Sequence, residues 1–454
     1  MSVEILSRLQ FAFTIAFHYL YPPLSIGLGV VLVLLEGQYL RTGDKVWEQL
    51  TRFWIKIFAL IFGIGVATGI VMEFEFGTNW ATYSRYVGDI FGSALAAEGI
   101  FAFALESGFL GILIFGWNRV GPRVHFFSTV MVALGSMFSA IWIVVANSWM
   151  QTPAGFRIDG EGLMARAVVT DFWAMVFNPS SMSRLTHVIL GSFLAGSFLV
   201  MSVHAWYIWK GRFVEASKKA FRVALFVATA AALVQLFSGH RSAQYVAEYQ
   251  PAKLAAFEGH YDSLAVADLY IFGKTDPQKQ KTVGLAIPGM LSFLIYEDFE
   301  KPVPGLNAFP PENRPKQVNF VFQTYHFMVA IGMALIGLTL LALFLLWREK
   351  LFQQQWLMRI FVPAVLLPQI ANQLGWYSAE VGRQPWVVYG LLRTSDALSK
   401  AVSAEQVLFS LILFTFVYTL LFVLFVYLLN KKIQHGPEGL EGIEDIPDYS
   451  KRFR

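Results

Sequence analysis

Residues 318–347 read VNFVFQTYHFMVAIGMALIGLTLLALFLLW and contain no Asp, Glu, Lys or Arg. An α-helix of this length extends about 45 Å, which exceeds the roughly 30 Å hydrocarbon core of a bilayer. Further apolar stretches lie at 11–35, 53–76, 94–117, 125–149, 185–209, 220–238, 357–378 and 404–430. The sequence therefore predicts an all-α membrane helix bundle of about nine transmembrane helices.

The composition supports this interpretation. Of 454 residues, 56% are hydrophobic and only 15% are charged, whereas an ordinary soluble domain has about 25% charged residues. The mean hydropathy is +0.52. These values exclude a disordered chain, a soluble multidomain enzyme and a nucleic-acid-binding protein. Because the chain has no cysteine, disulfides, iron–sulfur clusters and thiolate zinc sites are excluded as well.

Basic residues predict the orientation of the helices. They gather in the short loops after the first, third, fifth and seventh helix and after the last one. These residues are Arg41, Lys45, Arg119, Arg123, Lys210, Arg212, Lys218, Lys219, Arg348, Lys350, Lys431 and Lys432. By the positive-inside rule these loops are cytoplasmic, so we expect the N-terminus outside and the C-terminus inside.

The same pattern divides the chain into four segments. We expect helices one to six in 1–238 and a polar outer-face loop in 239–317. Helices seven to nine follow in 318–430, and a cytoplasmic tail in 431–454. A polar loop as long as 239–317 is usually functional or flexible in a compact protein.

Several residues that can bind metal or carry protons lie inside the predicted helices. Burying a charge there costs about 2.5–3.5 kcal/mol on insertion scales, so such residues are candidates for function. They are His18, Glu98, Glu106, His187, Met328 and Glu380. Each also has a structural explanation, since a histidine can join two helices, a methionine can pack, and two glutamates can form a polar seam.

The predicted topology brings most of these candidates together. His18, Glu98, His187, Met328 and Glu380 all fall toward the outer leaflet. His, Met and carboxylate side chains can ligate haem iron, and His–Met ligation raises the redox potential.

Counting histidines restricts the kind of haem protein. His326 and Met328 lie about 200° apart on a helix, so only one of them can bind a given iron. The chain has neither the histidine pair nor the His-x-x-x-His-Tyr run of a copper-containing haem oxidase. Only the fifth helix contains two histidines, His187 and His204, which argues against two bis-histidine haems. The pattern favours a haem protein without copper.

Three segments resemble subunit I of cytochrome bd-type quinol oxidases. Residues 382–386 read GRQPW, residues 250–258 read QPAKLAAFE, and residues 6–12 read LSRLQFA. The resemblance covers nearly the whole chain. The short outer loop and the run YHFM at 325–328 look similar to the cyanide-insensitive branch of the family.

The resemblance implies a set of haem ligands. His187 and Met328 would ligate a low-spin haem b. His18 and Glu380 would ligate two high-spin haems, one a haem b and the other a haem d or a further haem b in its place. Arg8, Trp376 and Arg383 would surround the haems, and the arginines would pair with propionates.

Two further pairs of residues gain a role from the resemblance. Glu98 would border the pair of high-spin haems and, with Glu106, would lie on a proton path. Lys253 and Glu258 match positions that the family uses in quinol oxidation. The resemblance thus implies a haem site in 1–238 and makes the outer-face loop 239–317 a quinol-binding loop.

The resemblance also implies the overall reaction and its setting. Ubiquinol or menaquinol would be oxidised at the outer face of a bacterial cytoplasmic membrane, and O2 would be reduced to water with protons from the cytoplasm. A second oxidase subunit and any small single-helix subunit would be the protein partners. Two other classes remain open on the residues alone: a polytopic transporter without haem, and a haem electron carrier that does not reduce oxygen.

Overall fold

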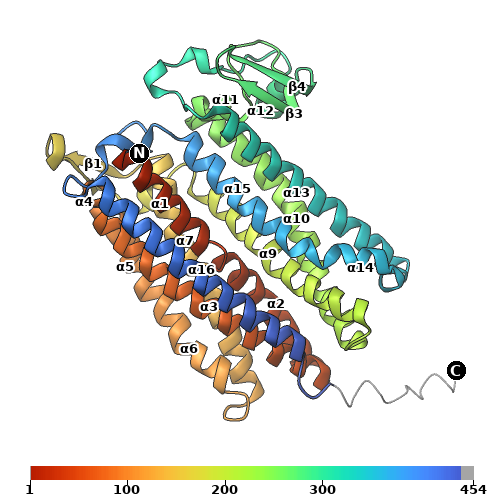
Figure 1. Cartoon of the computed structure of the whole chain (residues 1–454). Helices are drawn as coiled ribbons and strands as arrows, with labels where there is room; N and C mark the ends of the chain where they lie inside the picture. The colour runs from red at the N-terminus through yellow and green to blue at the C-terminus, as the bar shows by residue number, and fades with distance from the viewer. Residues whose placement is uncertain (1, 441–454) are drawn as a thin grey trace, which may run out of the picture.

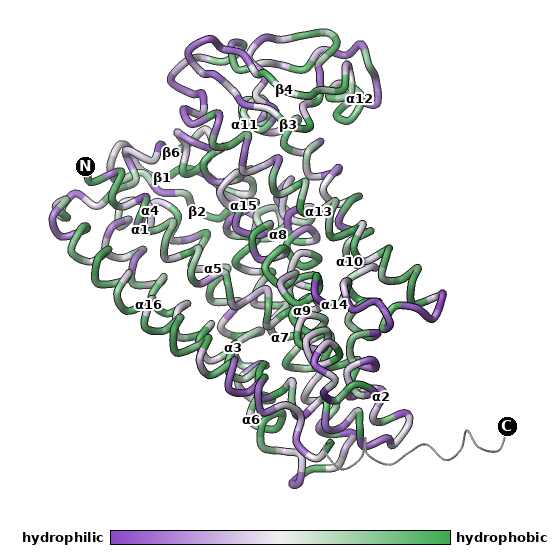
Figure 2. Tube along the Cα trace, turned by 45° about the vertical axis from the view of Figure 1, so that its right-hand side comes forward, coloured by the Kyte–Doolittle hydropathy of each residue, from purple (hydrophilic) through white to green (hydrophobic). Residues whose placement is uncertain are grey.

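The structure is a computed structural model that describes residues 2–440. In this part of the chain nine helical segments are long and apolar enough to cross a membrane. They run side by side, and apolar residues predominate along most of their length (Figures 1 and 2). The prediction of an all-α bundle of about nine membrane helices is therefore confirmed.

The long helices have the following bounds. They are α1 Val3–His18 followed by α2 Pro22–Thr42, α3 Lys45–Thr78, α5 Gly88–Ala97 continued by the π-helix η1 Glu98–Phe103 and α6 Ala104–Phe115, α7 Pro122–Gln151, α9 Ser181–Lys210, α10 Val214–Tyr249, α13 Val318–Trp347, α14 Gln355–Phe361 followed by α15 Leu366–Gly382, and α16 Ala404–His435.

Three spans differ from the bounds expected from hydropathy. The first is interrupted directly after His18, and Pro22 then opens α2. The eighth is interrupted at Pro363, between α14 and α15. Proline lacks an N–H and fits only the first turn of a helix, which explains both breaks. Helix α10 continues to Tyr249, well past the expected end at 238, because hydropathy does not detect a helix that leaves the bilayer.

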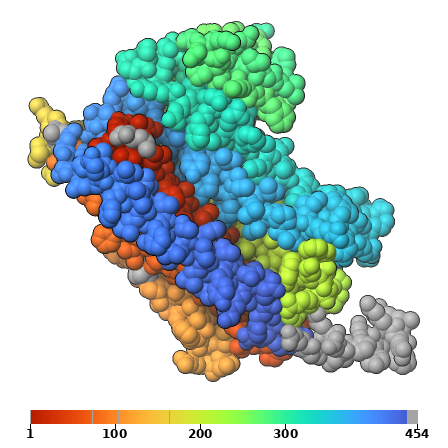
Figure 3. All heavy atoms as spheres, in the orientation of Figure 1, coloured from red at the N-terminus to blue at the C-terminus, as the bar shows by residue number. Residues whose placement is uncertain are grey.

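Short elements connect the spans. They are α4 Ala81–Tyr86, α8 Phe172–Val176, α11 Pro251–Phe257, α12 Met290–Tyr296, and the antiparallel pairs β1 Phe156–Asp159 with β2 Arg166–Val169, β3 Leu269–Asp276 with β4 Lys281–Ile287, and β5 Trp386–Val388 with β6 Leu392–Arg393. Residues 251–317, here called the hairpin lobe, stand at one end of the bundle (Figures 1 and 3).

Helix α9 lies in the centre of the bundle, and 78% of its most apolar 18-residue stretch is buried. It packs on α10 and α2. A Cβ added at Gly196 would lie 2.2 Å from the backbone of Gly27 and Leu28, so α2 and α9 touch through their backbones. Close approach through small residues is the usual way in which membrane helices pack.

The predicted basic loops meet at the end opposite the hairpin lobe. Lys219 Nζ lies 2.5 Å from Asp44 Oδ2, and Lys56 Nζ lies 2.6 Å from Glu438 Oε1. The first contact joins the loop before α3 to the start of α10, and the second joins α3 to the segment after α16. Of the tail expected in 431–454, residues 441–454 lie outside the described residues.

Helix α16 covers one side of the bundle and is the least buried span. In Figure 3 it crosses the visible face diagonally, in blue. It packs on α1 through aromatic rings, of which Phe17 and Tyr418 stack with their centroids 4.3 Å apart. This contact fixes α1, whose last residue is His18.

Candidate active site

Helix α15 connects the parts of the bundle that carry the candidate ligands. On one side, Gln373 Nε2 donates to the backbone oxygen of Ala16 at 2.8 Å, and Trp376 contacts Tyr19 edge-on at 5.4 Å between centroids. On another side, Gly375 lies against Met328 of α13. The end of α1 and the middle of α13 therefore meet the same short helix.

His187 and Met328 lie on helices that converge on α15. Gly191, one turn after His187 on α9, is so close to Asn372 of α15 that an added Cβ would lie 2.8 Å from its Oδ1. Met328 Sδ is equally close to Gly375, where an added Cβ would lie 2.9 Å away. Asn372 and Gly375 are three residues apart and share a face of α15.

The tautomer of His187 suits a metal ligand. Its Nε2 accepts from Gln235 Nε2 at 3.1 Å, and its Nδ1 lies 3.3 Å from Ser238 Oγ. Since Nε2 accepts, Nδ1 carries the proton and donates to the serine. A ligating histidine is typically oriented by such a bond from Nδ1. In this structure the Gln235 amide occupies the Nε2 lone pair, so this amide has to turn away before Nε2 can bind a metal.

His18 has the same arrangement at the end of α1. Its Nδ1 lies 3.0 Å from Thr68 Oγ1, and the Thr68 hydroxyl already donates to the backbone oxygens of Ile64 and Gly65. Nδ1 must therefore donate to the hydroxyl, which leaves Nε2 with a lone pair. Gly69 lies beside the ring, where an added Cβ would be 3.3 Å from His18 Cε1.

Glu380 belongs to a polar cluster near the C-terminal end of α15. One of its oxygens accepts from Asn147 Nδ2 at 3.4 Å and from Gln151 Nε2 at 3.2 Å, and the other pairs with Arg383. Arg184 of α9 donates to the side chain of Asn147. The cluster thus joins α7, α9 and α15 around one carboxylate and two guanidinium groups.

The arginines of this cluster have unused donors. Arg184 Nε and Arg383 Nε and Nη1 are buried and have no hydrogen-bond partner among the described residues. Buried N–H groups without partners are rare, and an anionic carboxylate such as a haem propionate would satisfy them. A glycine also lies beside each of His18, His187 and Met328, in the last two cases Gly239 and Gly375. The residues present therefore fit haem.

Lys253 connects the hairpin lobe to the same cluster. It is buried at the start of α11 and donates from Nζ to Gln151 Oε1 at 3.0 Å. The next acceptor along this path is Glu380, which binds Gln151 Nε2. Burial lowers the pKa of Lys253 well below its usual value, the charges of Arg184 and Arg383 lower it further, and the Glu380 carboxylate opposes the shift. A single amide thus separates the Lys253 nitrogen from the Glu380 carboxylate.

Glu258 ends α11 and lies in a different environment. It is 3% exposed, and its Oε2 has no hydrogen-bond partner. Burial raises the pKa of Glu258 to about 8, although a hydrogen bond from Tyr325 opposes the shift. His326 Nε2 lies 3.9 Å from Oε2 and is bound to the backbone oxygen of Tyr270 at 2.8 Å. His326 and Met328 therefore face different elements, as the helical spacing predicts.

Glu98 and Glu106 both face α7. Ser139 Oγ donates to Glu98 Oε1 at 2.5 Å, and Glu106 is buried against Gly135, where an added Cβ would lie 2.5 Å from Glu106 Cγ. Gly135 and Ser139 are one turn apart, so the two carboxylates lie along one face of α7. The π-helix at Glu98–Phe103 changes their relative angle from the value expected for a regular α-helix.

Arg8 lies apart from the two buried arginines. Its guanidinium is 3.8 Å from Glu4, one turn earlier on α1. Sequence reasoning missed Arg184, Asn147 and Gln151, which complete the Glu380 cluster. A signal for Arg184 was present, since this charge occurs in the first turn of an apolar helix, three residues before His187. The two amides gave none, because uncharged polar residues are common in membrane helices.

Comparisons with known proteins show which family this chain resembles. The family described as cytochrome bd terminal oxidase subunit I matches residues 6–437. The Bacillus subtilis cytochrome bd ubiquinol oxidase subunit 1 is 37% identical, over 98% of this chain and 97% of that protein. The Escherichia coli cytochrome bd-II ubiquinol oxidase subunit 1 is 35% identical, over 96% and 97%.

A second Bacillus subtilis protein is named as a putative cytochrome bd menaquinol oxidase subunit I. It is 34% identical, over 94% of this chain and 95% of that protein. Among solved structures, a chain of the bd oxidase from Geobacillus thermodenitrificans superimposes with a TM-score of 0.89 at 29% identity. The alignment covers 96% of this chain and 99% of that one.

Proposed function

Because the chain belongs to the family of cytochrome bd terminal oxidase subunit I, we propose that its described clusters are the haem, quinol and proton sites of the oxidase. Membership alone makes the protein a subunit of a membrane-bound respiratory quinol oxidase with haem cofactors, for which quinol and oxygen are the substrates. The assignment of individual residues goes further and rests on their geometry.

His187 and Met328 are the proposed ligands of a low-spin haem b. His18 and Glu380 are the proposed ligands of two high-spin haems, one haem b and the other haem d or a further haem b. When bound, these groups would pass electrons from quinol to oxygen and hold the oxygen at a site without copper. The observation that carries the assignment is the convergence of the helices bearing His18, His187 and Met328 on α15, next to the buried and unpaired N–H groups of Arg184 and Arg383.

Arg184 and Arg383 would hold the propionates. Their buried and unpaired N–H groups supply the positive charge that such anions need. Trp376 would border the same space, since it contacts Tyr19 and directly follows Gly375, which lies against Met328. Arg8 would join this set only if it left Glu4.

Lys253 and Glu258 are the proposed quinol-binding residues. Quinol must lose two protons when it gives up two electrons, so a proton acceptor is needed at its site. The Glu258 carboxylate has an oxygen without a partner and a pKa near neutrality, which suits that task. Lys253 can orient a quinol oxygen and remains linked to Glu380 through Gln151.

Protons for oxygen reduction would come from the opposite end. Reducing one O2 to two waters takes four electrons and four protons, and two quinols supply the electrons. If protons are released at the lobe end and taken up at the basic end, charge crosses the membrane. Glu106 and Glu98, lined up along α7, form the proposed inner part of this route.

The proposed setting is the bacterial cytoplasmic membrane, with the N-terminus outside and the C-terminus cytoplasmic. A second oxidase subunit and a small single-helix subunit are the proposed partners. The relatives include proteins named as ubiquinol and as menaquinol oxidases, and either quinol would meet the same Lys253 and Glu258.

A reduced-minus-oxidised spectrum of the purified complex tests this proposal. We expect haem b bands, with a red-shifted chlorin band where haem d is present, and quinol-dependent oxygen consumption by the same sample. Haem bands without oxygen consumption would support an electron carrier instead. Folded protein without any haem bands would contradict the proposal and favour a transporter.

A further inference from the structure

A buried acid–base pair lies at the basic end of the bundle, away from the candidate ligands. Glu36 of α2 and His125 of α7 are each 1% exposed. His125 Nδ1 lies 2.6 Å from Glu36 Oε1, and Thr129 Oγ1 donates to Glu36 Oε2 at 2.5 Å. The other ring nitrogen, Nε2, lies 3.1 Å from the backbone oxygen of Leu113 in α6. The pair therefore joins three helices.

The hydrogen bonds of the pair fix the number of its protons. Because the Leu113 carbonyl can only accept, Nε2 must carry a proton. One further proton then lies between Nδ1 and Oε1. When Nδ1 holds this proton, the pair is an imidazolium with a carboxylate. When Oε1 holds it, the pair is a neutral histidine with a carboxylic acid. Both forms satisfy the same contacts, so this proton can move between the two residues without any change in packing.

Another buried histidine at the same end provides a contrast. His204 Nε2 accepts from Trp54 Nε1 at 3.0 Å, so its Nδ1 carries the proton and donates to Ser217 Oγ at 3.0 Å. This ring has no carboxylate partner, and its protons are fixed by neutral groups. His204 therefore serves packing, whereas His125 shares a proton with an acid.

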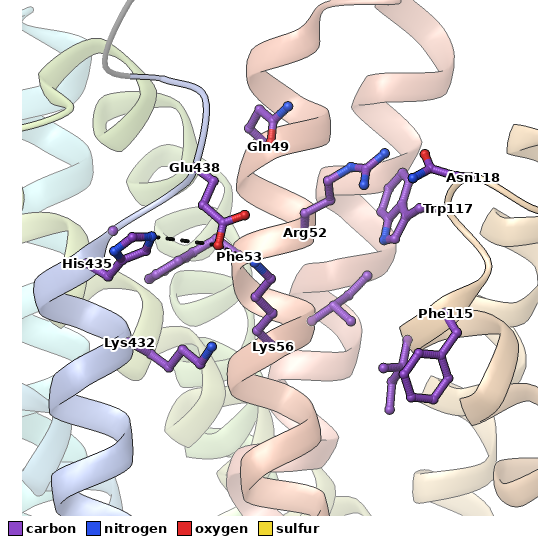
Figure 4. A pocket seen from close by; sticks show the side chains of 13 residues that line it. Gln49, Arg52, Phe53, Lys56, Phe115, Trp117, Asn118, Lys432, His435 and Glu438 are labelled. Carbon is purple, nitrogen blue, oxygen red and sulfur yellow. Dashed lines mark hydrogen bonds and ion pairs between the residues drawn. The ribbon is translucent and has the colours of Figure 1, made fainter.

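The pair is close to a polar pocket. Trp117 lies against the His125 ring, with 3.9 Å between the centroids and an angle of 33° between the planes, and it also lines a pocket of about 230 Å³. Figure 4 shows this pocket, with Arg52 beside Trp117 and Lys56, Lys432 and Glu438 on the far side. One aromatic ring thus separates the pair from charged side chains at the basic end.

A stripe on α7 leads from the pair toward the proposed proton route. His125, Thr129, Val132, Ser136 and Ser139 follow each other at spacings of four, three, four and three residues, so they share one helix face. Four of these five residues are polar. The stripe ends at Ser139, which donates to Glu98. Glu106 lies against Gly135, which directly precedes Ser136.

Ser136 places a buried hydroxyl in the middle of this stripe, next to the Glu106 side chain. Its hydroxyl is buried and has no hydrogen-bond partner among the described residues. The step from Thr129 to Ser136 passes Val132 and measures about 10 Å along the helix. Transfer over that distance needs bridging water, for which Ser136 offers a binding group.

We propose that Glu36 and His125 load protons from the basic end of the molecule onto the route through Glu106 and Glu98. The inference rests on the proposed function, because it extends the proton route of that proposal. A proton taken from the pocket side gives an imidazolium beside a carboxylic acid. The Thr129 hydroxyl then turns from Glu36 Oε2 to the backbone oxygen of His125, 3.2 Å away, so that its oxygen accepts a hydrogen bond from the acid and one proton passes on along the stripe. Only N–H and O–H bonds form and break, and no redox step is involved.

Proton uptake in a single turnover tests the inference. The complete oxidase is reduced, mixed with oxygen, and followed both by haem absorbance and by a pH-indicating dye. We expect E36Q and H125Q to slow proton uptake about tenfold or more, in the range of lost acid–base catalysis, with unchanged reduced haem spectra. E36D should retain much of the rate, and H204Q should match the unaltered protein.

The comparison with E106Q separates the two proposals. If E106Q does not slow uptake, the proton route of the proposed function is wrong. If E106Q slows uptake but E36Q and H125Q behave like H204Q, the present inference is overturned and the pair only joins helices. Should E36Q fail to assemble with its haems, T129V removes the hydroxyl next to the acid instead. Slow uptake in T129V would support the inference, and normal uptake would contradict it.

Discussion

At the scale of single residues, the polar atoms near the proposed sites differ in whether they have partners. His18 and His187 each use Nδ1 as a donor and keep Nε2 as an acceptor. Arg184, Arg383 and Glu258 instead keep buried atoms without a partner. The two histidines are therefore oriented by their Nδ1 hydrogen bonds. The two arginines have N–H donors, and Glu258 has a carboxylate oxygen, that remain available to a bound group.

Replacing the sulfur ligand tests the assignment of Met328. M328L keeps the volume nearly unchanged, so we expect the free energy of unfolding to fall by less than about 1.5 kcal/mol. The thioether is lost, however, and the low-spin haem b signal and quinol oxidation should be lost with it. The measurements are the reduced spectrum and oxygen consumption. M333L, at an exposed position of the same helix, is the control and should leave both unchanged.

Glu258 predicts a dependence on pH. With a pKa of about 8, only about a tenth of this carboxyl is ionised at pH 7. If the carboxylate accepts a proton from quinol, the rate of quinol oxidation should rise with pH until about 8. E258Q should abolish most of the rate and flatten the remaining profile, whereas E248Q, at an exposed position, should keep the slope.

The raised pKa of Glu258 also makes the free energy of unfolding depend on pH, and this free energy should fall over the range in which the rate of quinol oxidation rises. The folded protein holds the Glu258 proton more tightly than the unfolded chain, whose pKa is near 4.5. The stabilisation is therefore complete below pH 4.5 and is lost as pH rises through about 8. A rate that fell over this range together with the stability would contradict the role of Glu258 as a proton acceptor.

At the scale of elements, α15 determines the geometry of the proposed sites. Two breaks make this possible: α1 ends at His18, and α15 starts anew after Pro363. The short helix contacts α1 through Gln373 and Trp376, and it contacts α13 through Gly375. Glycine at 375 is what allows the Met328 sulfur to come this close.

Replacing Gly375 with alanine should displace the Met328 sulfur without changing the ligand residue itself. In G375A the new methyl group would lie 2.9 Å from Met328 Sδ, so the thioether has to move. We expect a shifted or weakened low-spin haem b spectrum and slower quinol oxidation. In the control G337A the methyl group meets nothing within 4 Å. Alanine in a helix there should stabilise the protein by about 0.5–1 kcal/mol and leave the spectrum intact.

At the scale of the whole molecule, the two ends differ in chemistry. The hairpin lobe, which includes Lys253 and Glu258, stands at one end, and the basic loops lie at the other (Figures 1 and 2). The proposed quinol oxidation and proton uptake are therefore separated along the bundle, which is the arrangement that moves charge across a membrane.

The absence of cysteine offers a direct test of the proposed orientation. Single cysteines are placed at the exposed positions 278 in the lobe and 350 in a basic loop, as Q278C and K350C. A maleimide that does not cross membranes should label Q278C on intact spheroplasts, and K350C only after permeabilisation. The unaltered subunit serves as the control without label. The reverse pattern would place the lobe in the cytoplasm and contradict the proposed proton direction.

The sequence by itself determined the bundle, its number of spans and the gathering of the basic loops at one end. It also led to the family, through GRQPW at 382–386 and QPAKLAAFE at 250–258. These properties depend on composition and on residues close together in the chain. The spacing of His326 and Met328 similarly predicted their different directions, because helix geometry alone decides it.

Only the tertiary structure decided which groups meet. The link from Lys253 through Gln151 to Glu380, the pairing of Glu36 with His125, and the glycines beside His18 and Met328 join residues far apart in the chain. Apolar helices of similar hydropathy can pack in many ways, so their sequences do not fix their neighbours. Close contacts such as that of Gly27 with Gly196 select one arrangement, and that arrangement determines the partner of each buried charge.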